Sequence, residues 1–296
     1  MPLGGIYISA FVRHDVAVHG TSPRSICHVA EYIISATAAS YSTAAGVMAG
    51  FAFACLGFVI TARSLGDADR SKNGWFDLAA QALGAAFVVL LMSSFDYAIL
   101  AGEPAPGGRA ASVEVLAGAG FTVAVLQLFY ALVLMVRAYH QDKEPPLTDF
   151  FVNVGAFLLC PLAYLMVVSG SAAYVEALHR SSGELVEVVG EVVGVCLVVA
   201  LIALRFVPRV FAVSAAQPLK IVRNPPQLAL GVGTLSIAGI SITAVAIREC
   251  AALPPALILA ALVGTALALW NQARWFVQLP SEYRAMKSVK ELLGKT

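Results

Sequence analysis

Apolar residues occur along the chain in long blocks, separated by short stretches that hold most of the charged residues. Windows of about 20 residues match a bilayer hydrocarbon core roughly 30 Å thick, and they predict seven membrane-spanning helices. These are residues 41–62, 78–100, 115–136, 151–173, 186–206, 228–247 and 253–273. The fifth span is the least uniform, because Glu187 and Glu191 lie in its first turns. We therefore expect an all-α fold, a polytopic bundle of seven transmembrane helices within residues 36–276.

The composition agrees with a membrane location. Of the 296 residues, 59% are hydrophobic and 12% are charged, whereas a soluble domain carries roughly 25% charged residues. Ala, Val and Gly are abundant, and Arg outnumbers Lys by 13 to 6, a usage typical of GC-rich bacterial genomes. We therefore expect a multi-pass protein of the bacterial cytoplasmic membrane, with the lipid bilayer as its partner and no nucleic-acid partner.

The basic residues predict the orientation, because cytoplasmic loops carry an excess of Lys and Arg. With the N-terminus outside, the outer segments hold 5 of the 19 basic residues and the inner segments hold the other 14. Carboxylates have the opposite distribution, with ten outside and eight inside. The N-terminus is therefore predicted to lie outside and the C-terminus inside, with an acidic outer mouth that would attract cations.

Both ends of the chain lie beyond the predicted spans. Residues 1–35 lack the basic start and long apolar run of a signal peptide. They predict a polar outer extension, unless translation starts further downstream. Residues 277–296 predict a basic cytoplasmic tail, expected to lie as an amphipathic helix on the inner membrane surface. This tail and the basic, Pro-bounded loop 205–226 are candidate contacts for a cytoplasmic partner.

The five cysteines fall into two groups. Cys27 and Cys250 are both predicted on the outer side, where an oxidising environment would allow a disulfide between the extension and the bundle. Two free thiols are the alternative. Cys55, Cys160 and Cys196 fall within spans and are expected to be small, buried apolar residues.

A weak internal repeat relates the first two helical hairpins. Ala49-Gly50-Phe51 in the first span matches Ala119-Gly120-Phe121 in the third, 70 residues later. The match indicates a duplication of hairpin 41–100 as hairpin 115–173. Chance agreement between helices rich in Ala, Gly and Leu is the alternative.

Small residues and one proline predict where helices touch and bend. Gly46-x3-Gly50, continuing to Ala54, and Gly190-x3-Gly194 are patterns that let neighbouring helices approach closely. Pro161 lies in the middle of the fourth span, where it removes a helical hydrogen bond. It predicts a kink and a candidate hinge.

Polar residues inside the spans are the candidates for function, because burying them in hydrocarbon costs several kcal/mol unless they are paired or hydrated. Asp96 lies about one turn from the outer end of span two, and a partly dehydrated carboxylate can exchange protons near neutral pH. The predicted substrate or ion path consists of three carboxylates near the outer side, two serines beside them, and two amides toward an inner exit: Asp96, Glu187, Glu191, Ser93, Ser94, Gln127 and Asn153.

Each candidate also has a simpler structural explanation. The helix dipole and a capping box at the start of span five favour acidic residues there, which accounts for Glu187 but not for the deeper Glu191. Asp96 would either reach interfacial water, or pair with Arg109 or Arg248, or face a functional cavity. Single amides such as Gln127 usually make hydrogen bonds between helices.

Motifs exclude several functional classes. Residues 253–273 contain no Lys, which excludes a retinal protein of this topology, and no His lies deep within a span to hold haem. The sequence has no GxxxxGK[ST], HExxH or GxSxG motif, so we expect no enzyme, metal or cofactor. A small-solute or cation/proton-coupled transporter or channel is the leading interpretation. The alternatives are a membrane-embedded sensor or accessory subunit, and a structural scaffold.

Overall fold

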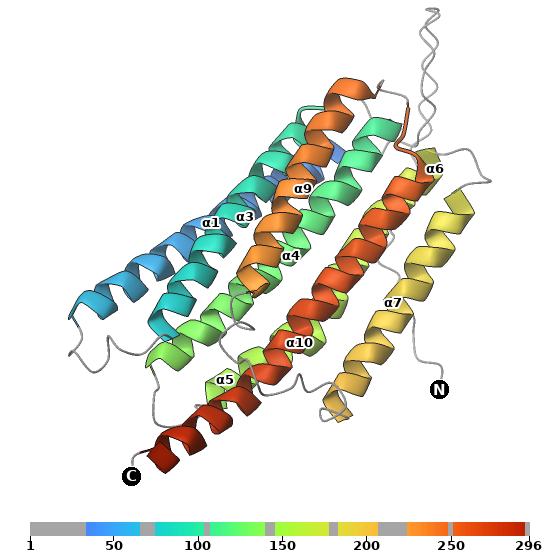
Figure 1. The fold of residues 1–296 in the computed structure, drawn as a ribbon. Coiled ribbons are helices and arrows are strands. Elements are labelled where there is room, and N and C mark those ends of the chain that lie inside the picture. Colours follow the sequence, from blue (N-terminus) through green and yellow to red (C-terminus); the bar gives the residue numbers. More distant parts are fainter. Residues whose placement is uncertain are drawn as a thin grey trace, which may run out of the picture.

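A computed structural model describes residues 34–65, 75–103, 107–139, 146–177, 183–206, 224–247 and 251–293. These residues form long helices and contain no strand (Figure 1). The elements are α1 (Ile34–Leu65), α3 (Trp75–Ala101), α4 (Gly108–Tyr139), α5 (Pro146–Asn153), the π-helical segment η1 (Val154–Leu159), α6 (Cys160–Ala177), α7 (Gly183–Phe206), α9 (Asn224–Ala246) and α10 (Pro255–Leu293). The predicted all-α bundle of about seven helices is confirmed, with α5, η1 and α6 forming the fourth.

Six of these helices are long and apolar enough to cross a membrane. The apolar part of α7, Val188–Leu204, is shorter than the others, which agrees with the weaker signal of the fifth predicted span. Successive long helices run in opposite directions (Figure 1). We call the end of the bundle where α3 ends and α4 begins the outer end, after the predicted orientation, which itself stays a prediction.

The central helix of the bundle is α4. In its most apolar stretch 72% of the residues are buried, against 28% in α1 and in α9. It packs against α3 and α9 on one side and against α6 and α10 on the other, while α7 is covered by α6 and α10 (Figure 1). The bundle therefore has two groups of helices, α1/α3/α9 and α6/α7/α10, which are joined through α4.

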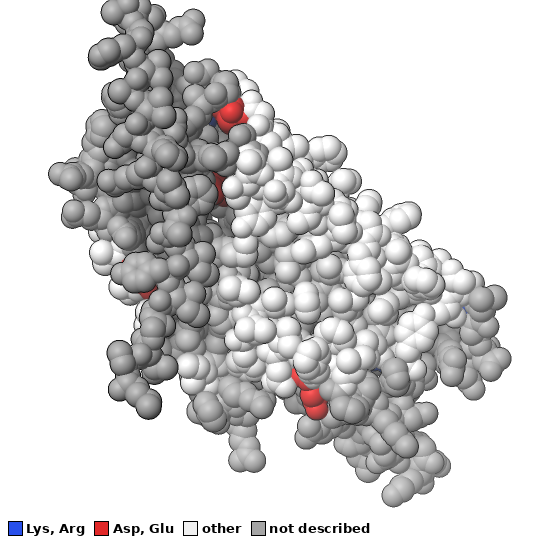
Figure 2. Space-filling view, turned by 180° about the vertical axis from the view of Figure 1, so that it is seen from behind, with Lys and Arg blue, Asp and Glu red and all other residues white. Residues whose placement is uncertain are grey.

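The side of the bundle is apolar, as expected of a surface in contact with lipid. Figure 2 shows a described surface that is almost wholly uncharged, with carboxylates confined to a few places. Large apolar side chains exposed on the helices of the bundle include Phe53, Phe58, Leu165, Val195 and Val245. Ion pairs lie toward the ends of the helices, where Arg63 pairs with Asp77 and Arg109 with Glu103.

Pro161 changes the hydrogen bonding of the fourth span. It has no amide hydrogen, and its ring would clash with the carbonyl group four residues earlier in a regular α-helix. The turn before it is π-helical, and the amide of Cys160 donates to the carbonyl oxygen of Gly155, five residues back. A Cβ atom at Gly155 would lie 2.8 Å from Cζ of Phe276 in α10, so the glycine permits close packing at this irregular turn. A hinge at Pro161 stays a prediction.

Small residues make close helix contacts at one of the two predicted patterns. A Cβ atom at Gly194 would lie 3.1 Å from the ring of Tyr164 in α6, so α6 and α7 do approach closely there. In α1 the prediction is wrong at Gly50 and Ala54, which are exposed. The contact with α3 instead uses a row of buried alanines one residue out of step with the glycines: Ala38, Ala45, Ala49 and Ala52.

One further expectation needs correction. Cys55 and Cys160 are buried, but Cys196 is exposed on α7, because this peripheral helix has few neighbours on its outer side. The predicted tail is helical as far as Leu293, where it continues α10 (Figure 1), and its place on the inner membrane surface stays a prediction.

Candidate functional sites

Asp96 is buried where three helices meet. Its side chain is only 1% exposed, although it lies near the end of α3. The hydroxyl of Ser236 in α9 lies 3.1 Å from Oδ2 of Asp96 and 2.8 Å from the carbonyl oxygen of Leu116 in α4. A hydroxyl has a single hydrogen to donate, so these two acceptors share it. No hydrogen-bond partner for Oδ1 of Asp96 is found among the described residues.

Glycines allow this three-helix junction to form. A Cβ atom at Gly120 in α4 would lie 2.9 Å from Oγ of Ser236, and one at Gly233 in α9 would lie 2.9 Å from Cγ1 of Val89 in α3. Such short distances would force the helices apart. Ser93 also lies here, but its hydroxyl donates to the carbonyl oxygen of Val89 at 2.9 Å, within its own helix. The junction is therefore tightly packed around a carboxylate for which the described residues provide one donor, a neutral hydroxyl.

The arginine predicted as a possible partner of Asp96 is engaged elsewhere. Nη2 of Arg109 lies 2.6 Å from Oε2 of Glu103, and Nη1 lies 3.5 Å from the carbonyl oxygen of Ile247. Arg248 lies outside the described residues. Asp96 therefore neither reaches the surface nor pairs with Arg109.

The remaining predicted path residues on α3, α4 and α5 make local or pairwise contacts. Ser94 faces α1, where its hydroxyl and that of Ser42 each donate to the other residue's carbonyl oxygen at 2.9 Å. Nε2 of the fully buried Gln127 donates to the carbonyl oxygen of Ala82 at 3.3 Å, linking α4 to α3. Nδ2 of Asn153 donates to the carbonyl oxygen of Asp149, in its own helix. No contact among these residues joins them to Asp96.

A second carboxylate, Glu114, lies on the opposite face of α4. It lines a cavity of about 60 Å³ between α1, α3, α4 and α6, together with Tyr41, Tyr97 and Thr122. The two tyrosine rings stack at a centroid distance of 5.2 Å, and both contact the ring of Phe121. A cavity of this size and polarity can hold water or a small cation.

The sequence prediction missed Glu114 and Ser236. Predicted span three started at residue 115, one residue after Glu114, whereas α4 begins at Gly108, so Glu114 was grouped with the outer loop. Ser236 is one of several hydroxyl residues in span six, and nothing in the sequence distinguishes it. The sequence did carry one signal for the cavity. Glu114 and Phe121 are seven residues apart, a spacing that places both on one helix face.

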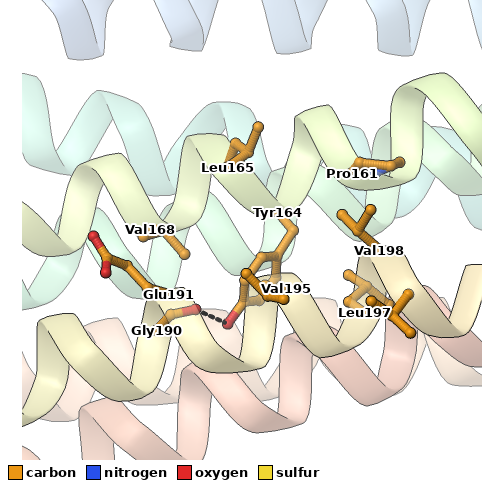
Figure 3. A pocket seen from close by; sticks show the side chains of 11 residues that line it. Pro161, Tyr164, Leu165, Val168, Gly190, Glu191, Val195, Leu197 and Val198 are labelled. Carbon is orange, nitrogen blue, oxygen red and sulfur yellow. Dashed lines mark hydrogen bonds between the residues drawn. The ribbon is translucent and has the colours of Figure 1, made fainter.

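Glu191 lies at a groove on the side of the bundle, between α6 and α7. The groove has a volume of about 480 Å³, and its walls include Pro161, Tyr164 and Leu165 of α6 and Val195 of α7 (Figure 3). The hydroxyl of Tyr164 is buried and donates to the carbonyl oxygen of Gly190 at 3.3 Å. Glu191 is exposed at one end of this groove.

The predicted carboxylates therefore occupy two places. Asp96 belongs to the α3/α4/α9 junction, whereas Glu191 belongs to α7, which packs against α6 and α10. The side chain of Glu187 and the cysteines Cys27 and Cys250 lie outside the described residues.

The apolar helices identify an integral, multi-pass membrane protein. Three of the carboxylates in its spans line the sites described above: Asp96 in the junction, Glu114 at the small cavity and Glu191 at the groove. Comparison of the chain with protein-family models, with curated proteins and with solved structures found no match.

Proposed function

We propose that the protein is a small-solute or cation/proton-coupled transporter of the bacterial cytoplasmic membrane, and that Asp96 binds the coupling cation or proton. The observation that carries the proposal is the burial of Asp96 between α3, α4 and α9, with one hydroxyl donor and with Oδ1 unpartnered among the described residues. Ionisable groups buried in membrane spans are costly, and they commonly mark ion and proton paths.

The chemistry of the junction suits reversible binding of a small cation. Oδ1 of Asp96 is available as a ligand, and the Ser236 hydroxyl can turn its hydrogen toward the carbonyl oxygen of Leu116 and offer its lone pairs instead. Carboxylate, hydroxyl and carbonyl oxygens are the ligands that hard cations prefer. The junction thus has a state that holds a proton and a state that can hold a cation.

The surroundings of the junction offer a route for cations toward Asp96 and a helix turn at which the bundle can bend. The cavity with Glu114 lies on the other face of α4, toward the outer end, where it can attract cations from the acidic side. The irregular turn before Pro161 is η1, which leads directly into α6, and α6 packs against α4. Bending at this turn would change the packing around the central helix. Because Asp96 and Glu191 do not converge on one vestibule, the proposal rests on Asp96.

Flux through proteoliposomes tests the proposal. Purified protein is reconstituted with pH- and cation-sensitive dyes, and Asp96→Asn is compared with the unchanged protein. Asparagine keeps the size of the side chain and an oxygen acceptor for Ser236, so the fold is expected to persist while flux falls at least tenfold. Flux at the original rate in Asp96→Asn contradicts the proposal. If liposomes that contain the protein show no more flux than empty liposomes for every cation tested, the sensor or accessory-subunit alternative is favoured.

A further inference from the structure

The groove between α6 and α7 opens on the side of the bundle rather than at its end. Its walls are almost entirely aliphatic, with Leu165 and Val168 of α6 facing Val195 and Val198 of α7 (Figure 3). Leu165 and Val195 are 59% and 65% exposed. The groove is therefore accessible from the surface that meets lipid, and it does not belong to the Asp96 junction.

Small residues and a buried phenol create the depth of this groove. Gly190 and Gly194 leave space on the α7 side, and the ring of Tyr164 lies against Gly194. The Tyr164 hydroxyl is satisfied by the carbonyl oxygen of Gly190, so it presents no open hydrogen-bonding group to an occupant. From Glu191 to Val199 the groove follows α7 for about 12 Å, at 1.5 Å per residue. This length and lining suit a single alkyl chain.

One end of the groove carries a negative charge. Glu191 lines it there beside Val168 (Figure 3), and no hydrogen bond or ion pair of its carboxylate is found among the described residues. Its neighbours on the exposed face of α7 are Val188, Val192 and Val195. A carboxylate on such an apolar, lipid-facing surface is unfavourable unless a counter-charge lies beside it. Glu191 lies only one turn inside the apolar stretch that begins at Val188, near the depth of lipid headgroups.

From these features we infer that the groove binds a single-chain amphiphile with a cationic headgroup. The ammonium group lies beside Glu191, and the alkyl chain follows α7 toward Pro161 and Val199. An anionic amphiphile is repelled by Glu191, and a phospholipid with a net negative headgroup gains nothing from the carboxylate. This binding site goes beyond the transport proposal, because it shares no residue with the Asp96 junction.

Photolabelling tests the inference. The protein is placed in phosphatidylcholine nanodiscs and labelled with a dodecyl-trimethylammonium probe that carries a diazirine at the chain end. A dodecyl-sulfate probe with the same diazirine is the control, and labelled peptides are located by mass spectrometry. We expect the cationic probe to label residues 195–199 or the facing turn of α6, with competition by unlabelled dodecyl-trimethylammonium.

Two variants separate the headgroup from the chain. Glu191→Gln is expected to weaken labelling by the cationic probe roughly tenfold and to remove its advantage over the sulfate probe. Val195→Trp fills the groove and should block labelling by both probes, whereas Val192→Trp, on the same exposed face but outside the groove, should leave it unchanged. Monodispersity and helix content show that each variant is folded.

Several results would overturn the inference. Equal labelling by the cationic and sulfate probes, unaffected by Glu191→Gln, means that the groove contacts the lipid annulus without selectivity. Labelling that survives Val195→Trp places the probe elsewhere. A Val195→Cys variant that also carries Cys196→Ala, to remove the native exposed thiol, and that cross-links to a second copy of the chain shows that another protomer occupies the groove.

Discussion

Two carboxylates in the spans, Asp96 and Glu191, have opposite environments in one bundle. Asp96 is 1% exposed and shares one hydroxyl donor with a backbone carbonyl. Glu191 is exposed on a peripheral helix, at the end of a groove of about 480 Å³. The first sits in packed protein, where water is excluded and the helices must approach closely. The second faces the region that lipid occupies.

The difference follows from the neighbours of each helix. Three helices surround α3, and glycines in α4 and α9 allow them to close over Asp96. Among the described residues, α7 is covered by α6, by α10 and by a few contacts with η1, so one side of the helix stays exposed. We propose that the first carboxylate binds a cation or proton and that the second attracts a charged amphiphile. The predictions below test whether these roles are separate.

The largest expected effect is a separation of the two activities by single substitutions. Asp96→Asn should lower proteoliposome flux at least tenfold and leave amphiphile labelling of the groove unchanged. Glu191→Gln should weaken labelling roughly tenfold and leave flux unchanged. Both assays are made on the same four samples, including the unchanged protein and the double variant. Loss of both activities in either single variant would mean that the two carboxylates serve one site.

Added bulk should be harmful at the junction and tolerated at the groove. Gly120→Ala places a Cβ atom 2.9 Å from Oγ of Ser236, and overpacking of this kind costs about 1–3 kcal/mol. Val195→Trp lies on an exposed surface and should change the free energy of unfolding by less than about 0.5 kcal/mol. Unfolding in mixed micelles, followed by circular dichroism, measures both.

Gly50→Ala is the matched control for Gly120→Ala. The two glycines occupy equivalent positions of the predicted repeat, but a Cβ atom at Gly50 meets nothing within 4 Å. Alanine there should stabilise the helix by up to about 1 kcal/mol, because it favours the helical conformation. Equal effects at the two positions would show that the packing at Gly120 is looser than the distances indicate.

The pair Gly50 and Gly120 also shows what a sequence pattern can and cannot predict. Long apolar blocks predicted the helices, because bilayer thickness fixes their length. The pattern could not say which helix is central, since α1 and α4 both contain an apolar stretch long enough to cross a membrane. Ala49-Gly50-Phe51 and Ala119-Gly120-Phe121 look alike in sequence, yet Phe51 is 50% exposed and Phe121 is 7% exposed. Burial depends on how many neighbours a helix has.

The candidate site was predictable in part for the same reason. Asp96 was identified because a charge in an apolar run is costly wherever it lies. Its partner Ser236 lies 140 residues away in the sequence, and only the approach of α9 to α4 at Gly120 brings the two together. Glu187 and Glu191 were grouped with Asp96 because all lie near the same end of their helices. The sequence shows how far along its helix a residue lies. It does not show where that helix lies around the axis of the bundle.

Removal of the Ser236 hydroxyl should have an intermediate effect. Ser236→Ala leaves both Asp96 and the carbonyl oxygen of Leu116 without this donor, and we expect a loss of about 1–2 kcal/mol in the free energy of unfolding. The control is Thr234→Ala. Thr234 lies two residues before Ser236 on the exposed side of α9, and its hydroxyl donates to a carbonyl oxygen within its own helix. Equal losses in the two variants would remove Ser236 as a specific partner of Asp96.

The smallest expected effect is the coupling between Ser42 and Ser94, and it serves as the reference for the coupling between Asp96 and Ser236. Ser42 and Ser94 exchange two neutral hydrogen bonds between α1 and α3, and hydrogen bonds between membrane helices contribute on average about 0.6 kcal/mol. Each hydroxyl donates to a backbone carbonyl group that the other substitution leaves in place. Ser42→Ala and Ser94→Ala should therefore each cost about 0.6 kcal/mol, and their double-mutant cycle should give a coupling free energy near zero. Because asparagine keeps an oxygen acceptor for Ser236, the cycle of Asp96→Asn and Ser236→Ala measures how much more strongly Asp96 binds the hydroxyl than a neutral amide does. A coupling at the junction no larger than the serine pair's would mean that Asp96 interacts with Ser236 as a neutral group, so that the proton-bound form predominates in the resting protein. A clearly larger coupling would mean that the carboxylate is ionised there, and the cation it then needs becomes the substrate to look for first.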